Sequence, residues 1–128
     1  MQYGEDVWEA RCFRIGPDDE NWPWLVCITY NRYNLFLARE VLKTEPTSNE
    51  LWNTILQAVN CSAARGVPPP KTLIAEPGLI WDSLKRQLGE IGIELAKSHH
   101  LLYPDGFPEW VDAVWQDWQT VASNSTPG

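Results

Sequence analysis

Two adjacent histidines, His99 and His100, are the first candidates for chemistry, and they are the only histidines in the sequence. Adjacent side chains in a strand or turn point in different directions, so the pair is poorly placed to share a metal ion, and we expect it in a solvated loop. Ser98 precedes the pair, but adjacency in sequence does not create the hydrogen bonds of a catalytic triad. Glycine-rich phosphate loops and the HExxH and GxSxG patterns are absent. The sequence therefore offers no motif for nucleotide binding or hydrolysis.

Three cysteines, Cys12, Cys27 and Cys61, form neither a CxxC pair nor a spacing typical of a zinc site. Two fall in strand-like runs and Cys61 in a helical one, where a free cysteine usually behaves as a small buried hydrophobic residue. The odd count predicts free thiols and a reducing compartment. The amino terminus lacks a basic segment followed by an apolar one, and no apolar stretch reaches the ~20 residues that span a bilayer. We therefore expect a cytoplasmic protein that does not enter a membrane.

Eight tryptophans are more than a domain of 128 residues needs to fill its interior, since each buries roughly 150–250 Å². Trp110, Trp115 and Trp118 cannot share one narrow stripe of a helix, because steps of five and eight residues turn them around its axis by about 100° per residue. Trp22 and Trp24 flank a turn, where one ring can pack inward while the other stays at the surface. We predict an aromatic contact site with Trp22, Trp110 and Trp115 as its candidate residues.

The chain has a formal net charge of −7 and a sequence pI of about 4.7. Such a charge repels a phosphate backbone, and the basic residues form no run, so the composition argues against nucleic acid as a partner. An apolar share of 44% is ordinary for a folded domain. We expect a single α/β domain over residues 1–122, followed by a flexible tail over 123–128.

Apolar periodicity and turn residues divide the chain into strands and helices. Thr47 and Glu50 have the spacing of a capping box and mark the start of the first helix. The run around Ala38 contains helix-forming residues, but its short connection to the preceding strand favours a third strand. The expected elements are, in order, strands over 7–15, 24–30 and 35–42, a helix over 47–65, a strand over 72–75, a helix over 79–91, a strand over 93–96 and a helix over 108–121.

This order predicts a three-strand antiparallel meander followed by α-β-α-β-α, in one mixed sheet covered by helices. From Val7 to Val121 it resembles the ribonuclease H-like fold, a three-layer sandwich with the same succession of elements. A second resemblance is to a family of bacterial and cyanobacterial domains of unknown function. It rests on the segment Pro70-Lys71-Thr72-Leu73-Ile74-Ala75, the amphipathic helix that follows, and Gly92-Ile93-Glu94-Leu95.

The first resemblance implies a divalent-metal site, because ribonuclease H-like enzymes hold two ions with carboxylates from the first strand, first helix, fourth strand and last helix. The chain has an acidic residue at each place, namely Glu9, Glu50, Glu76 and Asp112 or Asp117. Mg²⁺ or Mn²⁺ would be the cofactor. With 17 acidic residues, one in each element is also expected by chance, and Glu50 is already accounted for by the capping box.

Three functions remain open. The first is a non-catalytic module that binds a protein, without a cofactor, through an aromatic patch with an acidic rim; it is favoured by aromatic excess without a catalytic motif. The second is a metal-dependent nuclease or phosphotransfer enzyme using the four carboxylates. The third is a small-molecule sensor whose ligand binds at the carboxyl ends of the parallel strands, near Glu76-Pro77-Gly78 and Ser98-His99.

Overall fold

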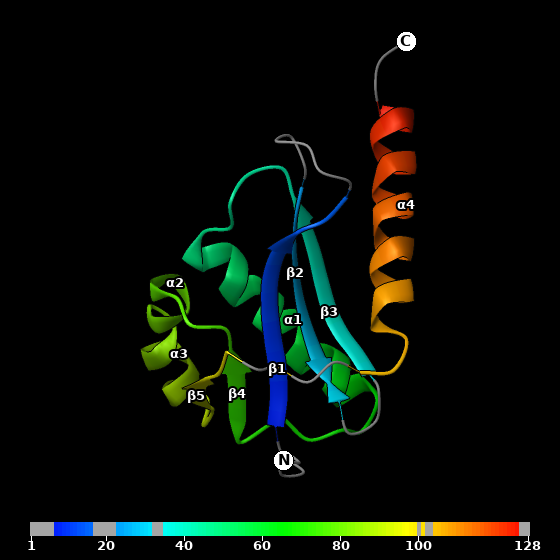
Figure 1. Cartoon of the computed structure of the whole chain (residues 1–128). Helices are drawn as coiled ribbons and strands as arrows, with labels where there is room; N and C mark the ends of the chain where they lie inside the picture. The colour runs from blue at the N-terminus through cyan, green and yellow to red at the C-terminus, as the bar shows by residue number, and fades with distance from the viewer. Residues whose placement is uncertain (1–6, 17–22, 32–34, 100, 102–103, 126–128) are drawn as a thin grey trace.

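The computed structural model describes residues 7–16, 23–31, 35–99, 101 and 104–125 (Figure 1). Trp22 and His100 lie outside the described residues. The elements are, in chain order, β1 (Val7–Arg14), β2 (Trp24–Tyr30), β3 (Leu35–Leu42), α1 (Ser48–Ala64), β4 (Thr72–Ala75), α2 (Leu79–Asp82), α3 (Lys85–Glu90), β5 (Glu94–Lys97) and α4 (Phe107–Ser125).

The strands form one five-stranded sheet in the order β3-β2-β1-β4-β5. The predicted meander is confirmed, since β1 pairs antiparallel with β2 and β2 with β3. Both pairs that involve β4 are parallel, β1 with β4 and β4 with β5. The strand expected over 93–96 is β5, which pairs with β4 and forms an edge of the described sheet.

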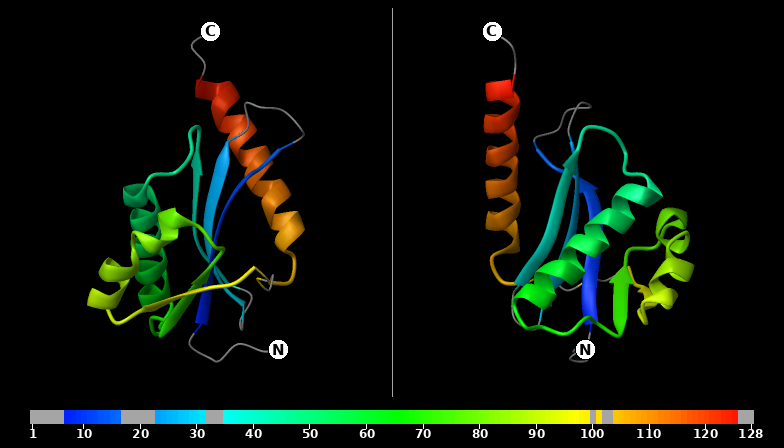
Figure 2. Two further views of the ribbon diagram at one scale, coloured as in Figure 1. Left: turned by 60° about the vertical axis from the view of Figure 1, so that its left-hand side comes forward. Right: turned by 180° about the vertical axis from the view of Figure 1, so that it is seen from behind.

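Helices cover both faces of the sheet, with α1, α2 and α3 on one side and α4 on the other (Figure 2). The larger core lies under α1, where Trp8, Ala10 and Ile28 of the sheet meet Leu51 and Ile55 of the helix. A smaller core, centred on Leu25, Cys27, Phe107 and Val114, lies under α4. Three layers and a mixed sheet confirm the predicted fold class. No described helix is long and apolar enough to cross a membrane.

The third strand contains an irregularity that explains its ambiguous sequence. Ile28 pairs with Ala38, but the next residue, Thr29, pairs with Phe36, so Leu37 is an extra residue on β3. Such a bulge breaks the strict alternation of a strand. As a result the adjacent Leu37 and Ala38 both face the larger core, a pattern that in sequence resembles a helix.

The capping box at the start of α1 is confirmed. The Glu50 backbone N–H donates to Thr47 Oγ1 (3.2 Å), and the Thr47 backbone N–H donates to the Glu50 carboxylate (3.0 Å). Both bonds satisfy donors that have no partner within the helix. Thr47→Ala should lower the free energy of unfolding by about 1 kcal/mol, measured by urea denaturation. Thr47→Ser, which keeps the hydroxyl, is the control and should lose much less; equal losses would contradict the cap.

The predicted helix over 79–91 is two short helices, α2 and α3, which corrects the expectation of one. The Ser83 hydroxyl donates to the Ile80 carbonyl (2.6 Å), and the Leu84 N–H bonds three residues back to Trp81 (3.0 Å), so the ladder tightens between them. Buried Leu84 and Leu88 keep helical spacing across the break, which hides it from periodicity. The last helix continues to Ser125, into the segment expected as a flexible tail.

Candidate functional site

A buried ion pair lies at the centre of the sheet, on the face that α4 covers. Residues alternate along β1, so Trp8 and Ala10 face α1 while Glu9 and Arg11 face the other way. Arg11 Nη2 lies 2.6 Å from Glu9 Oε1, and the side chains are 0% and 1% exposed. Charges this deeply buried are tolerated only when they are paired and hydrogen-bonded. The sheet therefore contains a compensated charge pair where purely apolar packing would otherwise be expected.

Two residues of β2 and its end complete the surroundings of this pair. Arg11 Nη1 donates to Thr29 Oγ1 (2.9 Å), and the Thr29 hydroxyl donates to Asn31 Oδ1 (2.9 Å). The Asn31 amide in turn donates to Glu9 Oε1. We call these four side chains the β1–β2 polar network. The Arg11 guanidinium also lies 5.0 Å from the ring centre of Phe107, the first residue of α4, so the network reaches the start of that helix.

The four predicted metal ligands are not brought together. Glu9 is bound by Arg11 and Asn31, whereas Glu50 caps α1 on the opposite face of the sheet. Among the described residues, no three His, Cys, Asp or Glu side chains form a group that could hold a metal ion. The residues therefore do not fit a two-ion centre of the kind implied by the fold. The sequence predicted which strand or helix contains each carboxylate, but it could not predict which face of the sheet each carboxylate lies on.

Glu76 comes closest to the place expected of it, directly after β4. Ala10 pairs with Ala75 in the parallel ladder, so the next position on β1 beside Glu76 is Arg11. The residue of β1 beside the end of β4 thus carries a guanidinium, where a shared metal ion would require a second carboxylate.

Two cysteines near these charges are protected from ionisation. Burial raises the pKa of Cys27 from 9.0 to about 12, although Arg11 acts in the opposite direction, and burial also raises the pKa of Cys12 to about 12. Thiolate is the reactive form, so both thiols should stay unlabelled at pH 8 in the folded chain. Cys61 serves as the internal comparison. We expect Ellman's reagent to modify Cys12 and Cys27 only after urea is added; rapid labelling in the native state would contradict this.

The same shifts set a pH dependence of stability. The pKa values of Cys12 and Cys27 are higher in the folded chain than in the unfolded one, so unfolding releases protons in alkaline solution. Their contribution is complete below about pH 9 and is lost as pH rises towards 12. Thermal unfolding followed between pH 8 and 11 should show a falling melting temperature, and Cys27→Ala, compared with the native chain, should fall less steeply.

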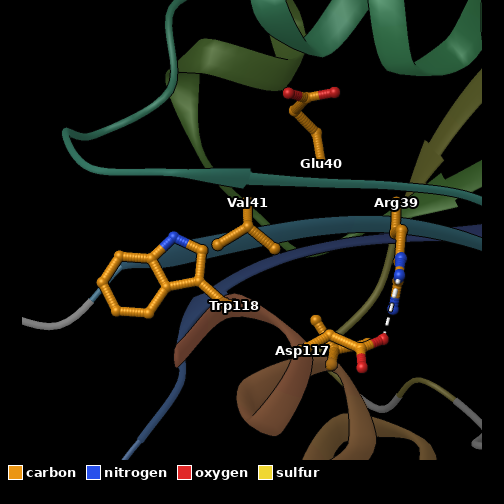
Figure 3. A pocket seen from close by; sticks show the side chains of 6 residues that line it. Arg39, Glu40, Val41, Asp117 and Trp118 are labelled. Carbon is orange, nitrogen blue, oxygen red and sulfur yellow. Dashed lines mark hydrogen bonds and ion pairs between the residues drawn. The ribbon is translucent and has the colours of Figure 1, made fainter. Parts of the chain in front are cut away.

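Two grooves flank α4 where it crosses the sheet. One, of about 210 Å³, lies between β3 and α4 and is lined by Arg39, Glu40, Val41, Val114, Asp117 and Trp118 (Figure 3). The other, of about 420 Å³, lies between the end of β1 and α4, with Phe13, Arg14, Gly16, Asp112 and Trp115 among its lining residues. Apolar walls bordered by charged side chains are typical of surfaces that contact other molecules.

The indole rings of Trp115 and Trp118 stack on each other, with centroids 5.6 Å apart and planes 16° from parallel. Each ring lines a different groove, and both are half-buried. Gly16 permits this arrangement: its φ is +108°, and a Cβ there would lie only 2.9 Å from the Trp115 ring. Trp110 stacks on Phe36 (centroids 4.5 Å apart), and both Trp110 and Trp115 pack against the smaller core. Of the tryptophans that the structure describes, Trp115 and Trp118 are the two that line the grooves beside α4, and the sequence had singled out Trp115.

The sensor ligand was predicted to bind near the segments that follow β4 and β5. The Ser98 N–H donates to the Ala75 carbonyl (3.0 Å), so the segments that leave β4 and β5 lie side by side, and His99 is exposed. Neither groove beside α4 includes Glu76, Pro77, Gly78 or Ser98. The small-molecule sensor remains a prediction.

The five-stranded mixed sheet and its two helical layers are those of the ribonuclease H-like fold. Solved structures of retroviral integrase catalytic cores share it. The core domain of BIV integrase has a TM-score of 0.62 and 13% identity, covering 98% of this chain and 76% of that one. The HTLV-2 integrase core in complex with magnesium, in its dimeric form, has a TM-score of 0.67 and 12% identity, covering 95% of this chain and 76% of that one.

A simian T-cell lymphotropic virus intasome in complex with PP2A regulatory subunit B56 gamma has a TM-score of 0.58 and 15% identity, covering 97% of this chain and 44% of that one. Identities this low establish the shared fold and leave function to the residues. No family model matches the chain, and no curated protein matches it, so the second family resemblance stays a prediction.

Proposed function

We propose that this chain is a non-catalytic domain of ribonuclease H-like fold that binds another protein along α4. The observation that carries the proposal is the stacked pair of Trp115 and Trp118, whose rings line the grooves on the two sides of the helix. Half-buried aromatic rings bind with little loss of conformational entropy, because they are already held in place. A partner that covers α4 would fill both grooves at once.

The charge of α4 indicates the kind of partner. The helix contains no Lys or Arg, and its exposed residues include Glu109, Asp112 and Asp117. Arg39 offsets only part of this, through an exposed ion pair with Asp117 (3.4 Å) that contributes little to stability. We expect a basic protein surface as the partner, and the same charge disfavours a phosphate backbone. The neighbouring intasome, which is in complex with a protein subunit, is consistent with a protein-binding role.

Site-specific photo-crosslinking tests this function. A photoreactive amino acid replaces Gln116, exposed on α4, and in the control it replaces Asn60, exposed on α1 on the other face of the sheet. Adducts are expected from position 116 and not from 60, and both Trp118→Ala and high salt should reduce them. Equal adducts from the two positions, or none from 116, would contradict binding along α4.

A divalent-metal-dependent nuclease or phosphotransfer enzyme is the second candidate. The shared fold favours it, since integrase cores have that fold and one is in complex with magnesium. Burial of Glu9 against Arg11 opposes it. We expect no cleavage of single- or double-stranded DNA or RNA in Mg²⁺ or Mn²⁺. Cleavage that Glu76→Gln abolishes would replace our proposal with this alternative.

The three cysteines are free thiols in the structure. Free thiols fit a reducing compartment, and we propose the cytoplasm as the location. The domain boundary expected at residue 122 also remains a proposal, with α4 extending past it.

A further inference from the structure

Arg11 is the residue of β1 beside Glu76, and its positive charge opposes the binding of a metal ion there. This holds whether or not α4 binds a protein. Arg11 is fully buried, and its guanidinium donates to both Glu9 and Thr29. Its distance of 5.0 Å from the Phe107 ring centre fixes it further between the sheet and α4. The cation therefore occupies the position of β1 that follows the Ala10–Ala75 pair, and it is held there by contacts to Glu9 of β1, Thr29 of β2 and Phe107 of α4.

We propose that the Arg11 guanidinium serves as a built-in counter-cation, so that the centre of this sheet takes no divalent ion and folds without one. Glu9 Oε1 already receives hydrogen bonds from both Arg11 and Asn31, so a metal at this oxygen would have to displace them. A divalent ion near Glu76 would meet the like charge of a guanidinium in a medium of low dielectric constant. Two-ion sites of this fold need several carboxylates around the metals. In this chain Arg11, a cation, stands beside the end of β4 where a carboxylate would be needed.

A pair of variants at one position tests the idea. Arg11→Asp and Arg11→Asn both remove the guanidinium and are close in size, but only the first adds a carboxylate between Glu9 and Glu76. Binding is followed by the electron paramagnetic resonance signal of free Mn²⁺, and stability by the melting temperature in Mn²⁺ and in EDTA.

The native chain should show no saturable Mn²⁺ binding at millimolar concentration and the same melting temperature in both solutions. Arg11→Asp should gain saturable binding, with a melting temperature at least about 4 °C higher in Mn²⁺ than in EDTA. Arg11→Asn should gain neither. Where Arg11→Asp is unfolded in EDTA, recovery of native circular dichroism on addition of Mn²⁺ is the expected result.

Should Arg11→Asp not fold in either solution, Glu9→Gln combined with Arg11→Asp removes one of the two buried carboxylates that then repel each other, and it should show the same gain. The inference is overturned if the native chain binds Mn²⁺ saturably and Glu76→Gln removes that binding. It is also overturned if the folded aspartate variants bind no more Mn²⁺ than Arg11→Asn. Neither result concerns photo-crosslinking along α4, so failure here leaves the proposed protein binding separately testable.

Discussion

Arg11→Ala should lower the free energy of unfolding by about 3–5 kcal/mol, a large part of the ~5–15 kcal/mol that stabilises a typical domain. The substitution removes the cation but leaves Glu9 buried, with the Asn31 amide still donating to its carboxylate. It also leaves Thr29 without its donor from Arg11 and Phe107 without the guanidinium against its ring. Urea denaturation at pH 7, followed by far-UV circular dichroism, measures the loss.

The double variant Glu9→Gln with Arg11→Met is the matched control. It removes both charges and keeps side chains of similar length, so no buried charge is left unpaired. Replacing a buried ion pair by apolar or neutral groups is often close to neutral, and we expect the double variant to be clearly more stable than Arg11→Ala. The coupling between the two positions then follows from the two single variants in a double-mutant cycle. A loss below about 1 kcal/mol for Arg11→Ala would show that the pair is not structurally important.

Trp8→Ala should also lower the free energy of unfolding by about 3–5 kcal/mol, but for a different reason. Trp8 is 1% exposed and is among the largest fully buried side chains of the chain. Its ring lies 6.4 Å from that of Tyr30, in the core between the sheet and α1. Interiors are close-packed, so removal of the indole leaves a cavity that the surrounding strands and helix can only partly fill.

Trp118→Ala provides the comparison for this prediction. The same side chain is removed, but Trp118 is half-buried beside a groove, and its stacking partner Trp115 remains. We expect a loss of about 1 kcal/mol by urea denaturation. Equal losses at the two positions would contradict the assignment of Trp8 to the core and of Trp118 to the surface. A small loss at Trp118 also makes that variant suitable for binding experiments.

The shared fold and the residues at its centre point to different functions. The arrangement of strands and helices is that of integrase catalytic cores, yet the charge next to the end of β4 is positive, from Arg11. Fold similarity reflects how layers pack, whereas metal binding depends on a few carboxylates converging on one point. For this reason we give more weight to the Glu9–Arg11 pair than to the fold in proposing a non-catalytic domain.

Local patterns predicted much of the architecture. The capping box of Thr47 and Glu50 predicted where α1 begins, because both of its bonds form within four neighbouring residues. Alternation predicted β1 and β2 in the same way. The break between α2 and α3 was missed, because it depends on a hydroxyl of Ser83 that bonds the helix backbone while the apolar spacing continues. The bulge at Leu37 likewise depends on pairing with β2.

By itself, the sequence determined the order of the elements and the acidic, tryptophan-rich composition, because these follow from residue types and spacings along the chain. The tertiary structure alone decided that Glu9 pairs with Arg11, that Glu50 lies across the sheet from it, and that Trp118 lines one groove beside α4 while Trp115 lines the other. Spacing tells which way a side chain points from its own strand or helix. What it meets there depends on strand register and on which face each helix covers, and both are set by packing between distant segments.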